Sequence, residues 1–301
     1  MFLIVMLYAL WALSVTTSKE LLAYTTPVYL TGMRMFLAGI ILLAYQYFYA
    51  HEHLRFQKKD IWLYLQTIFF GIYLTNILRF WALGSITAAK SMFLFNFSPF
   101  MSSLYSYFVF KEKMTRGQWF GLWLGVVGMI PILMSTSPSE QSIGEFFFFS
   151  WPEIATLISV ASQSYSWIVM RSLVRDRDYS PLMINGMSMF VGGFLALITA
   201  FFVEGFFPVT DVLPFFGMLM FVIVISNIIC HNLYGYLLRD YTATFMSFAG
   251  FMAPIFAAGL GWGLKGEVIT WHFYLSTVIV FIALYIFYKD ELKQGGIEVD
   301  A

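Results

Sequence analysis

The sequence predicts an all-α polytopic membrane protein with ten transmembrane helices, arranged as two inverted five-helix repeats. Three observations predict this fold class. Hydrophobic residues make up 60% of the 301 residues and charged residues only 11%, whereas a soluble domain is roughly a quarter charged. Apolar runs reach the roughly 20 residues that a helix needs to cross a bilayer. A pattern in the first half also returns in the second half.

The repeated pattern has a constant spacing. Thr87-Ala88, Pro99 and Glu112 return in the same order, 155 residues later, as Thr242-Ala243, Pro254 and Glu267. Each copy lies in an apolar run of membrane-spanning length, so the chain has the duplication that is typical of membrane carriers.

Charge clusters, prolines and glycines divide the first half into five spans. The N-terminal run is a span rather than a cleaved signal peptide, because it lacks a positively charged start and a cleavage site. Pro27 opens the second span, and the cluster from Lys58 to Asp60 precedes the third. The expected ranges are 2–21, 27–49, 61–82, 88–109 and 117–135.

The second half divides in the same way. The ranges are 151–171, 181–203, 212–237, 243–264 and 270–288. These runs lack the alternation of polar and apolar residues that marks barrel strands. In lipid, only a helix can then pair all of their backbone N–H and C=O groups in hydrogen bonds. We expect a first repeat over 1–137, a polar linker over 138–150, a second repeat over 151–290 and a cytoplasmic tail over 291–301.

The basic residues predict the orientation. With the N-terminus inside, the inner segments hold twelve of them: Arg55, Lys58, Lys59, Lys111, Lys113, Arg116, Arg171, Arg175, Arg177, Arg239, Lys289 and Lys293. The outer links hold only Lys19 and Lys265. The positive-inside rule therefore predicts that both termini are cytoplasmic. Five spans per repeat is an odd number, so the second repeat enters from the opposite side.

A family resemblance rests on short motifs in both halves. The first half carries Trp11 through Lys19, Pro27, Arg34, Ala82-Leu83, Thr87-Ala88, Ser98-Pro99 and Lys111-Glu112; the second half carries Pro181, Leu237-Leu238, Ala243, Ala253-Pro254 and Gly266-Glu267. This pattern resembles the EamA-type repeats of the drug/metabolite transporter superfamily. The resemblance implies a multi-pass carrier of the bacterial inner membrane, with its substrate held centrally by helices 1, 3, 4, 6, 8 and 9.

A narrower resemblance concerns the substrate. Ala12-Leu13-Ser14 and Thr31-Gly32-Met33-Arg34, with the aromatic content, are similar to the S-adenosylmethionine uptake carriers of obligate intracellular bacteria. This likeness implies alternating-access uptake of S-adenosylmethionine in exchange for S-adenosylhomocysteine. An exchanger of organic phosphates or nucleotide sugars, an exporter of amino acids and a passive channel remain alternatives.

Three basic residues lie inside spans or at their edges: Arg34, Arg79 and Lys90. Such residues usually face a partner or a water-filled cavity. We expect Arg34 to be a structural tether to a carbonyl and Arg79 to face a cavity. Lys90 is either an anion contact or a side chain that snorkels to the outer surface.

Helical spacing sets Ile72, Asn76 and Arg79 on one face, and the offset of 155 residues carries that face to Asn227, His231 and Tyr234. Residues at i, i+4 and i+7 share a helix face. Lipid penalises such polar stripes, so they should point inward, toward either substrate or neighbouring helices.

Aromatic residues near polar ones are the remaining candidates for substrate contact. Rings of this kind stack on a purine or hold a sulfonium by cation–π attraction, although packing is the alternative for each. The set comprises Tyr8, Trp11, Phe93, Asn96, Phe97, Gln163, Trp167, Phe248 and Phe251. Pro99 and Pro254 occupy matching points of the repeats and predict paired helix kinks.

Several classes of site and partner are not expected. Asp and Glu do not occur deep in any predicted span; Glu153 at the start of one and Asp240 beyond another are the nearest. Exchange or facilitated diffusion is therefore favoured over ion coupling. No catalytic motif, metal-ligand spacing or cofactor motif is present, so we expect no enzyme, metal or cofactor. The zero net charge gives no sign of nucleic acid. The expected partners are a small-molecule substrate and the lipid bilayer, with the chain a monomer or weak dimer.

Overall fold

The computed structural model describes residues 2–49, 57–110, 114–134, 142–146, 149–241, 246, 249–265 and 271–293, and within these ranges the chain is almost entirely helical. The first half contains α1 (Phe2–Leu21), α2 (Pro27–Tyr49), the 3-10 turn η2 (Lys58–Asp60), α3 (Ile61–Gln66), the π-helix η3 (Thr67–Leu74), α4 (Thr75–Leu83), α5 (Ala88–Phe95), α6 (Ser98–Phe110) and α7 (Arg116–Leu133). These bounds follow the first five predicted spans closely.

The second half begins with a small hairpin of β1 (Glu145–Phe146) and β2 (Phe149–Ser150). It continues with α9 (Trp151–Arg171), the π-helix η4 (Ser172–Asp176), α10 (Pro181–Val203), α11 (Val212–Val222), the π-helix η5 (Ile223–Cys230), α12 (His231–Leu237), α14 (Met252–Lys265) and α15 (Trp271–Lys293). The expected linker lies partly outside the described residues.

Within the described residues, five helical stretches are long and apolar enough to cross a membrane. They are Phe2–Leu21, Pro27–Tyr49, Lys58–Leu83, Pro181–Val203 and Val212–Leu237. The predicted span 151–171 is less apolar because α9 lies among other helices and carries buried serines. Ser159 donates to the Thr75 carbonyl at 2.9 Å, and Ser162 donates to the Phe70 carbonyl at 2.8 Å. The hydroxyls of α9 thus bind a helix of the other half.

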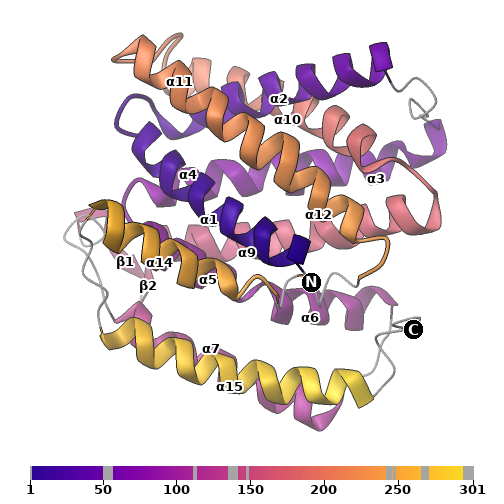
Figure 1. Cartoon of the computed structure of the whole chain (residues 1–301), viewed down its shortest axis with the longest axis vertical. Coiled ribbons are helices and arrows are strands. Elements are labelled where there is room, and N and C mark those ends of the chain that lie inside the picture. Colours follow the sequence, from indigo (N-terminus) through magenta and orange to yellow (C-terminus); the bar gives the residue numbers. More distant parts are fainter. Residues whose placement is uncertain are drawn as a thin grey trace.

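The helices stack in layers, as Figure 1 shows. At one edge α2 and α10 lie together with α11, at the opposite edge α7 packs on α15, and α1, α4 and α9 lie between these edges. The start of α1 and the end of α15 lie at the same end of the bundle (Figure 1). The candidate site described below lies among the middle helices.

The contact between α2 and α10 is reciprocal. A Cβ on Gly39 would lie 2.3 Å from the Phe190 nitrogen, and a Cβ on Gly193 would lie 2.3 Å from the Phe36 nitrogen. Both pairs of equivalent residues are 154 positions apart, and the Phe36 and Phe190 rings stack with centroids 5.2 Å apart. Small residues allow this backbone approach, and such exchange of contacts is the mark of a local two-fold relation.

Both predicted proline kinks lie beside helix breaks. The chain turns at Asn96 and Phe97, and Pro99 is the second residue of α6. It turns again at Gly250 and Phe251, and Pro254 is the third residue of α14. Proline fits the first turn of a helix because its missing N–H would have no partner there. The two residues therefore begin new helices rather than bending continuous ones.

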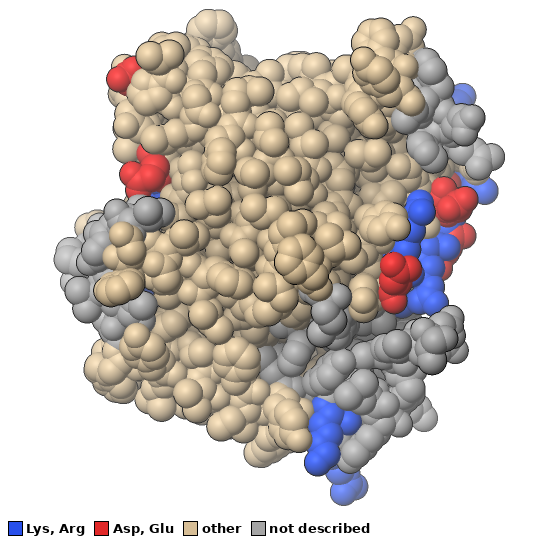
Figure 2. Space-filling model, viewed as in Figure 1, with Lys and Arg blue, Asp and Glu red and all other residues tan. Residues whose placement is uncertain are grey.

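Charged side chains leave a broad band of the surface free. In Figure 2 the visible face is almost wholly uncharged between two ends, and Lys and Arg gather at the end where α1 starts. At that end Asp60 pairs with Arg177 and accepts a hydrogen bond from the Tyr179 hydroxyl at 2.8 Å. Burial and then this bond raise the pKa of Tyr179. At the other end the Glu204 carboxylate accepts from the Val28 and Tyr29 nitrogens at the start of α2.

Candidate functional site

A cavity lies between the two halves of the chain. About 670 Å³ of space, including the part that opens outward, is not filled by atoms there. Residues of α1, α4, α5, α6, α9, α12 and α14, and of the turns before α6 and α14, line it: Tyr8, Trp11, Asn76, Arg79, Met92, Phe95, Asn96, Ser98, Gln163, Trp167, His231, Tyr234, Gly250 and Ala253.

Equivalent positions of the two halves meet in this cavity. Five pairs of its lining residues are 155 positions apart: Tyr8 and Gln163, Asn76 and His231, Arg79 and Tyr234, Phe95 and Gly250, and Ser98 and Ala253. The spacing is the one at which the sequence pattern repeats. The cavity is therefore built by the same elements of each half.

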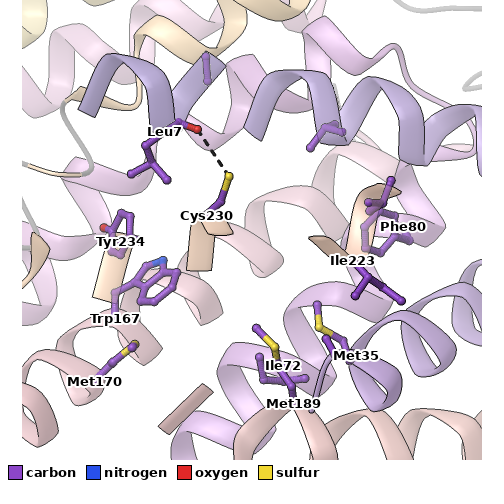
Figure 3. Packing of buried hydrophobic residues seen from close by; sticks show 14 of the residues in the cluster. Leu7, Met35, Ile72, Phe80, Trp167, Met170, Met189, Ile223, Cys230 and Tyr234 are labelled. Carbon is purple, nitrogen blue, oxygen red and sulfur yellow. Dashed lines mark hydrogen bonds between the residues drawn. The ribbon is translucent and has the colours of Figure 1, made fainter. Parts of the chain in front are cut away.

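One wall of the cavity is aromatic. The Trp167 and Tyr234 rings lie 4.2 Å apart between centroids and are neighbours in Figure 3. Trp11 lies 5.5 Å from Tyr234 and 5.9 Å from Tyr8. The Tyr8 hydroxyl donates to the Met246 carbonyl, and the buried Trp11 indole nitrogen has no hydrogen-bond partner among the described residues. Such a wall offers π-faces to a planar or cationic ligand.

Arg79 supplies the positive charge of the cavity. Its guanidinium carbon lies 4.3 Å from the centre of the Phe95 ring, and its Nε is buried without a hydrogen-bond partner in the described chain. No carboxylate of the described residues pairs with it. A guanidinium in this position can bind a carboxylate with paired hydrogen bonds.

Asn76 and His231 hold two widened helix segments in the same way. The Asn76 amide donates to the Ile72 carbonyl at 2.8 Å and, more weakly, to the Gly71 carbonyl at 3.3 Å, both in η3. The His231 Nδ1 lies 2.7 Å from the Ser226 carbonyl oxygen of η5. The bonds from Asn76 to Gly71 and from His231 to Ser226 each reach a carbonyl five residues back. The residues of the second bond lie 155 positions after those of the first. π-Segments often occur at functional sites, and here each one precedes a lining residue.

Lys90 lies away from the cavity lining and is paired. Its Nζ lies 2.6 Å from Glu153 Oε1, with the two side chains 5% and 0% exposed. Lys90 therefore does not snorkel to the surface. Glu153 lies in the first turn of α9, as the sequence predicts, and its side chain is completely buried. Its carboxylate also accepts a hydrogen bond from the Ser150 nitrogen in a capping box.

Arg34 is a buried tether, but it binds side chains rather than the expected carbonyl. Its Nε donates to Asn227 Oδ1 at 2.9 Å, and its NH2 donates to the Ser226 hydroxyl at 3.2 Å. The carbonyl of Ser226 already accepts from His231. Asn227 is thus engaged behind the cavity, and its amide lies 2.9 Å from the Met35 sulfur.

The remaining predicted aromatics lie in packed regions. Phe93 contacts Phe273, Phe97 contacts Phe100 and Phe251 contacts Phe281, with centroids 6.0, 5.4 and 6.1 Å apart. Phe248 lies outside the described residues.

Six lining residues were not among the predicted site residues: Met92, Phe95, Ser98, Tyr234, Gly250 and Ala253. Tyr234 belongs to the predicted polar stripe, and the offset of 155 residues from Arg79 could have identified it. Phe95 is one of 34 phenylalanines and has no local feature that sets it apart. Within the described chain, no three His, Cys, Asp or Glu residues gather as metal ligands would.

Known proteins resemble this chain over nearly its whole length. Proteins named S-adenosylmethionine/S-adenosylhomocysteine transporter from Chlamydia muridarum and Chlamydia trachomatis serovar D are each 30% identical and cover 98% of this chain, which spans 93% and 90% of their lengths. A solved crystal structure with 14% identity has a TM-score of 0.69, covering 95% of this chain and 93% of that chain; at this identity the likeness shows the fold alone.

The family assignment covers both halves. The model of the EamA-like transporter family matches residues 1–134 and again residues 150–289. These two segments contain every residue that lines the cavity. The chain belongs to the EamA-like transporter family, whose members are transporters rather than enzymes.

Proposed function

We propose that the chain carries S-adenosylmethionine into the cell in exchange for S-adenosylhomocysteine, by alternating access to the cavity. One observation carries this proposal: an aromatic wall and an unpaired guanidinium line the same cavity, between equivalent elements of the two halves. The names and the near-complete coverage of the chlamydial relatives support the same substrates.

The aromatic wall suits the adenosyl part of both substrates. Trp11, Trp167 and Tyr234 offer π-faces on which adenine can stack. The same faces attract the sulfonium of S-adenosylmethionine, whereas the neutral thioether of S-adenosylhomocysteine keeps only the stacking. A site that accepts both molecules is what an exchanger requires.

Arg79 suits the carboxylate that both substrates share. S-adenosylmethionine carries two positive groups and one carboxylate, so several cations in the cavity would repel it. Lys90 is neutralised by Glu153, and Arg34 lies behind the lining with neutral acceptors. Among the described lining residues Arg79 is thus the one lysine or arginine, and one carboxylate needs one such cation.

We further propose ten membrane spans in two inverted repeats, over residues 1–137 and 151–290, with both termini in the cytoplasm of a bacterial inner membrane. The reciprocal contact of Gly39 and Gly193 and the five lining pairs support the inversion. The start of α1 and the end of α15, which point toward the same end of the bundle in Figure 1, support the shared side of the termini. The proposed oligomeric state is a monomer or a weak dimer.

An exchanger of organic phosphates or nucleotide sugars is less well supported. A phosphate dianion needs several cationic donors, and Arg79 is alone in the described lining. The buried carboxylates Glu153 and Asp60 each have a basic partner. Neither is therefore a free ion-coupling group, and exchange remains the favoured mode.

Counterflow in proteoliposomes tests the proposal. Vesicles that contain the purified chain are preloaded with unlabelled S-adenosylhomocysteine, and radiolabelled S-adenosylmethionine is added outside. We expect saturable uptake that preloading stimulates several-fold over empty vesicles. Vesicles preloaded with a nucleotide sugar are the control. Equal stimulation by both preloads, or none by either, would contradict the proposed substrates.

A further inference from the structure

His231 presents one ring nitrogen in a defined state. Its Nδ1 lies 2.7 Å from the Ser226 carbonyl oxygen. A carbonyl only accepts hydrogen bonds, so Nδ1 must carry the hydrogen. In the neutral ring the other nitrogen, Nε2, is then an acceptor. Nε2 forms no hydrogen bond with any described residue.

The ring is fixed at the aromatic wall of the cavity. Its centroid lies 5.6 Å from that of Trp11 and 6.0 Å from that of Trp167. His231 is 5% exposed and lines the cavity. A hydrogen-bond acceptor is therefore held beside both indoles of the aromatic wall.

We propose that His231 recognises the exocyclic amino group of adenine through Nε2. This inference rests on the proposed function, since it assumes an adenosyl substrate. The 6-amino group of adenine donates two hydrogens, and one of them meets Nε2. A 6-oxo purine instead presents oxygen lone pairs there, so two acceptors face each other and both remain unpaired. His231 thus determines specificity for amino over oxo purines.

The wild-type chain gives the first test. Uptake of radiolabelled S-adenosylmethionine is measured against competing S-adenosylhomocysteine and against S-inosylhomocysteine, in which a carbonyl replaces the 6-amino group. We expect the inosyl compound to compete roughly tenfold more weakly, or worse, as an unmade buried hydrogen bond implies. Equal competition by the two compounds would overturn the inference.

Two variants assign the discrimination to this residue. His231→Phe keeps a ring beside Trp11 and Trp167 but removes the acceptor, and we expect the ratio of the two competitors to fall to about one. His231→Asn is the matched control. Asn76 stands at the equivalent position of the first half, and its amide donates to the Ile72 and Gly71 carbonyls. An asparagine at 231 can therefore donate to the equivalent carbonyls of Asn227 and Ser226 and still offer an acceptor. We expect it to preserve most of the discrimination.

The ratio separates recognition from a purely structural role. A residue that only holds η5 would change the amount of uptake in both variants without changing the ratio of the competitors. Discrimination that persists in His231→Phe, or is lost in His231→Asn while uptake continues, would overturn the inference. If S-adenosylhomocysteine fails to compete even in the wild-type chain, the proposed function itself fails, which is a distinct result.

Discussion

Three basic side chains inside apolar segments have three different surroundings, and the difference comes from what lies opposite each one. Lys90 meets Glu153 from the other half at 2.6 Å. Arg34 meets the neutral acceptors Asn227 and Ser226. Among the described residues, the Arg79 guanidinium meets only the face of Phe95. Since a cation in an apolar setting needs either a partner or access to water, Arg79 is the one suited to bind an anionic group from outside the protein.

Replacing Arg79 should weaken substrate binding rather than folding. A charge-assisted hydrogen bond is worth roughly 1.5–3 kcal/mol, so we expect Arg79→Ala to raise the apparent KM for uptake by roughly 10- to 100-fold. Arg79→Lys should lose less, because the charge remains. Arg239→Ala, which removes an exposed arginine, is the matched control and should leave KM unchanged. An unchanged KM in Arg79→Ala would remove this residue from the site.

The Lys90–Glu153 pair predicts the opposite behaviour. Removing one member leaves a buried charge alone, which costs roughly 3–5 kcal/mol, so Lys90→Met and Glu153→Gln should each lower the melting temperature in detergent strongly. The double variant should recover most of the loss, because both charges are then gone. Uptake should recover with it. If stability returns while KM remains high, Lys90 also contacts substrate, as the sequence alone allowed.

The candidate site was predictable where spacing carries the information. Asn76, Arg79 and His231 follow from helical periodicity and the offset of 155 residues, and all three line the cavity. The surroundings of Lys90 were not predictable, because its partner lies 63 positions away in the other half. Phe95 and Phe93 are near neighbours in one short helix, and only the packing of that helix decides that Phe95 faces the cavity.

At the scale of elements, hydrophobic length predicts where helices begin and end, but it does not reveal their internal breaks. The ranges 61–82 and 212–237 were expected as single helices, whereas each contains a π-segment, η3 and η5. A π-segment has about one more residue per turn than an α-helix, and the composition of a uniformly apolar run does not reveal where it occurs. The signal lies in side chains such as Asn76 and His231 that bind carbonyls five residues back, and this contact becomes visible only in three dimensions.

The packing of α2 on α10 gives a prediction with a built-in control. A Cβ on Gly39 would lie 2.3 Å from the backbone nitrogen of Phe190, so Gly39→Ala must separate the helices, at an overpacking cost of about 1–3 kcal/mol. Gly193→Ala should cost a similar amount, because its contact is the reciprocal one. Melting temperatures in detergent measure both effects.

Gly217→Ala is the matched control for these two variants. Gly217 lies inside α11, and a Cβ there would meet nothing within 4 Å. The substitution should therefore be neutral or slightly stabilising, since alanine is the better helix former. If Gly217→Ala destabilises the protein as much as Gly39→Ala does, the close approach of α2 and α10 is not the cause.

At the scale of the whole molecule, both halves contribute to the cavity, and charged residues lie at two opposite ends of the bundle. The five lining pairs at a spacing of 155 residues explain why the sequence repeat predicts a central site. The exposed basic residues Lys58, Lys59 and Arg175 lie in η2 and η4, and an uncharged band separates the two charged ends on the face in Figure 2. From this distribution we predict that the end with the basic residues faces the cytoplasm and the opposite end faces outward.

Labelling of single cysteines tests that assignment. Cys230 is the only cysteine of the chain and is replaced first by alanine. We expect a membrane-impermeant maleimide to label Glu20→Cys and Asp211→Cys in intact cells, because both positions are exposed at the outer end. Lys59→Cys and Arg175→Cys should react only after permeabilisation. Labelling of one inner and one outer position from the same side would break the two-ended arrangement, and with it the inverted repeats on which alternating access to the cavity depends.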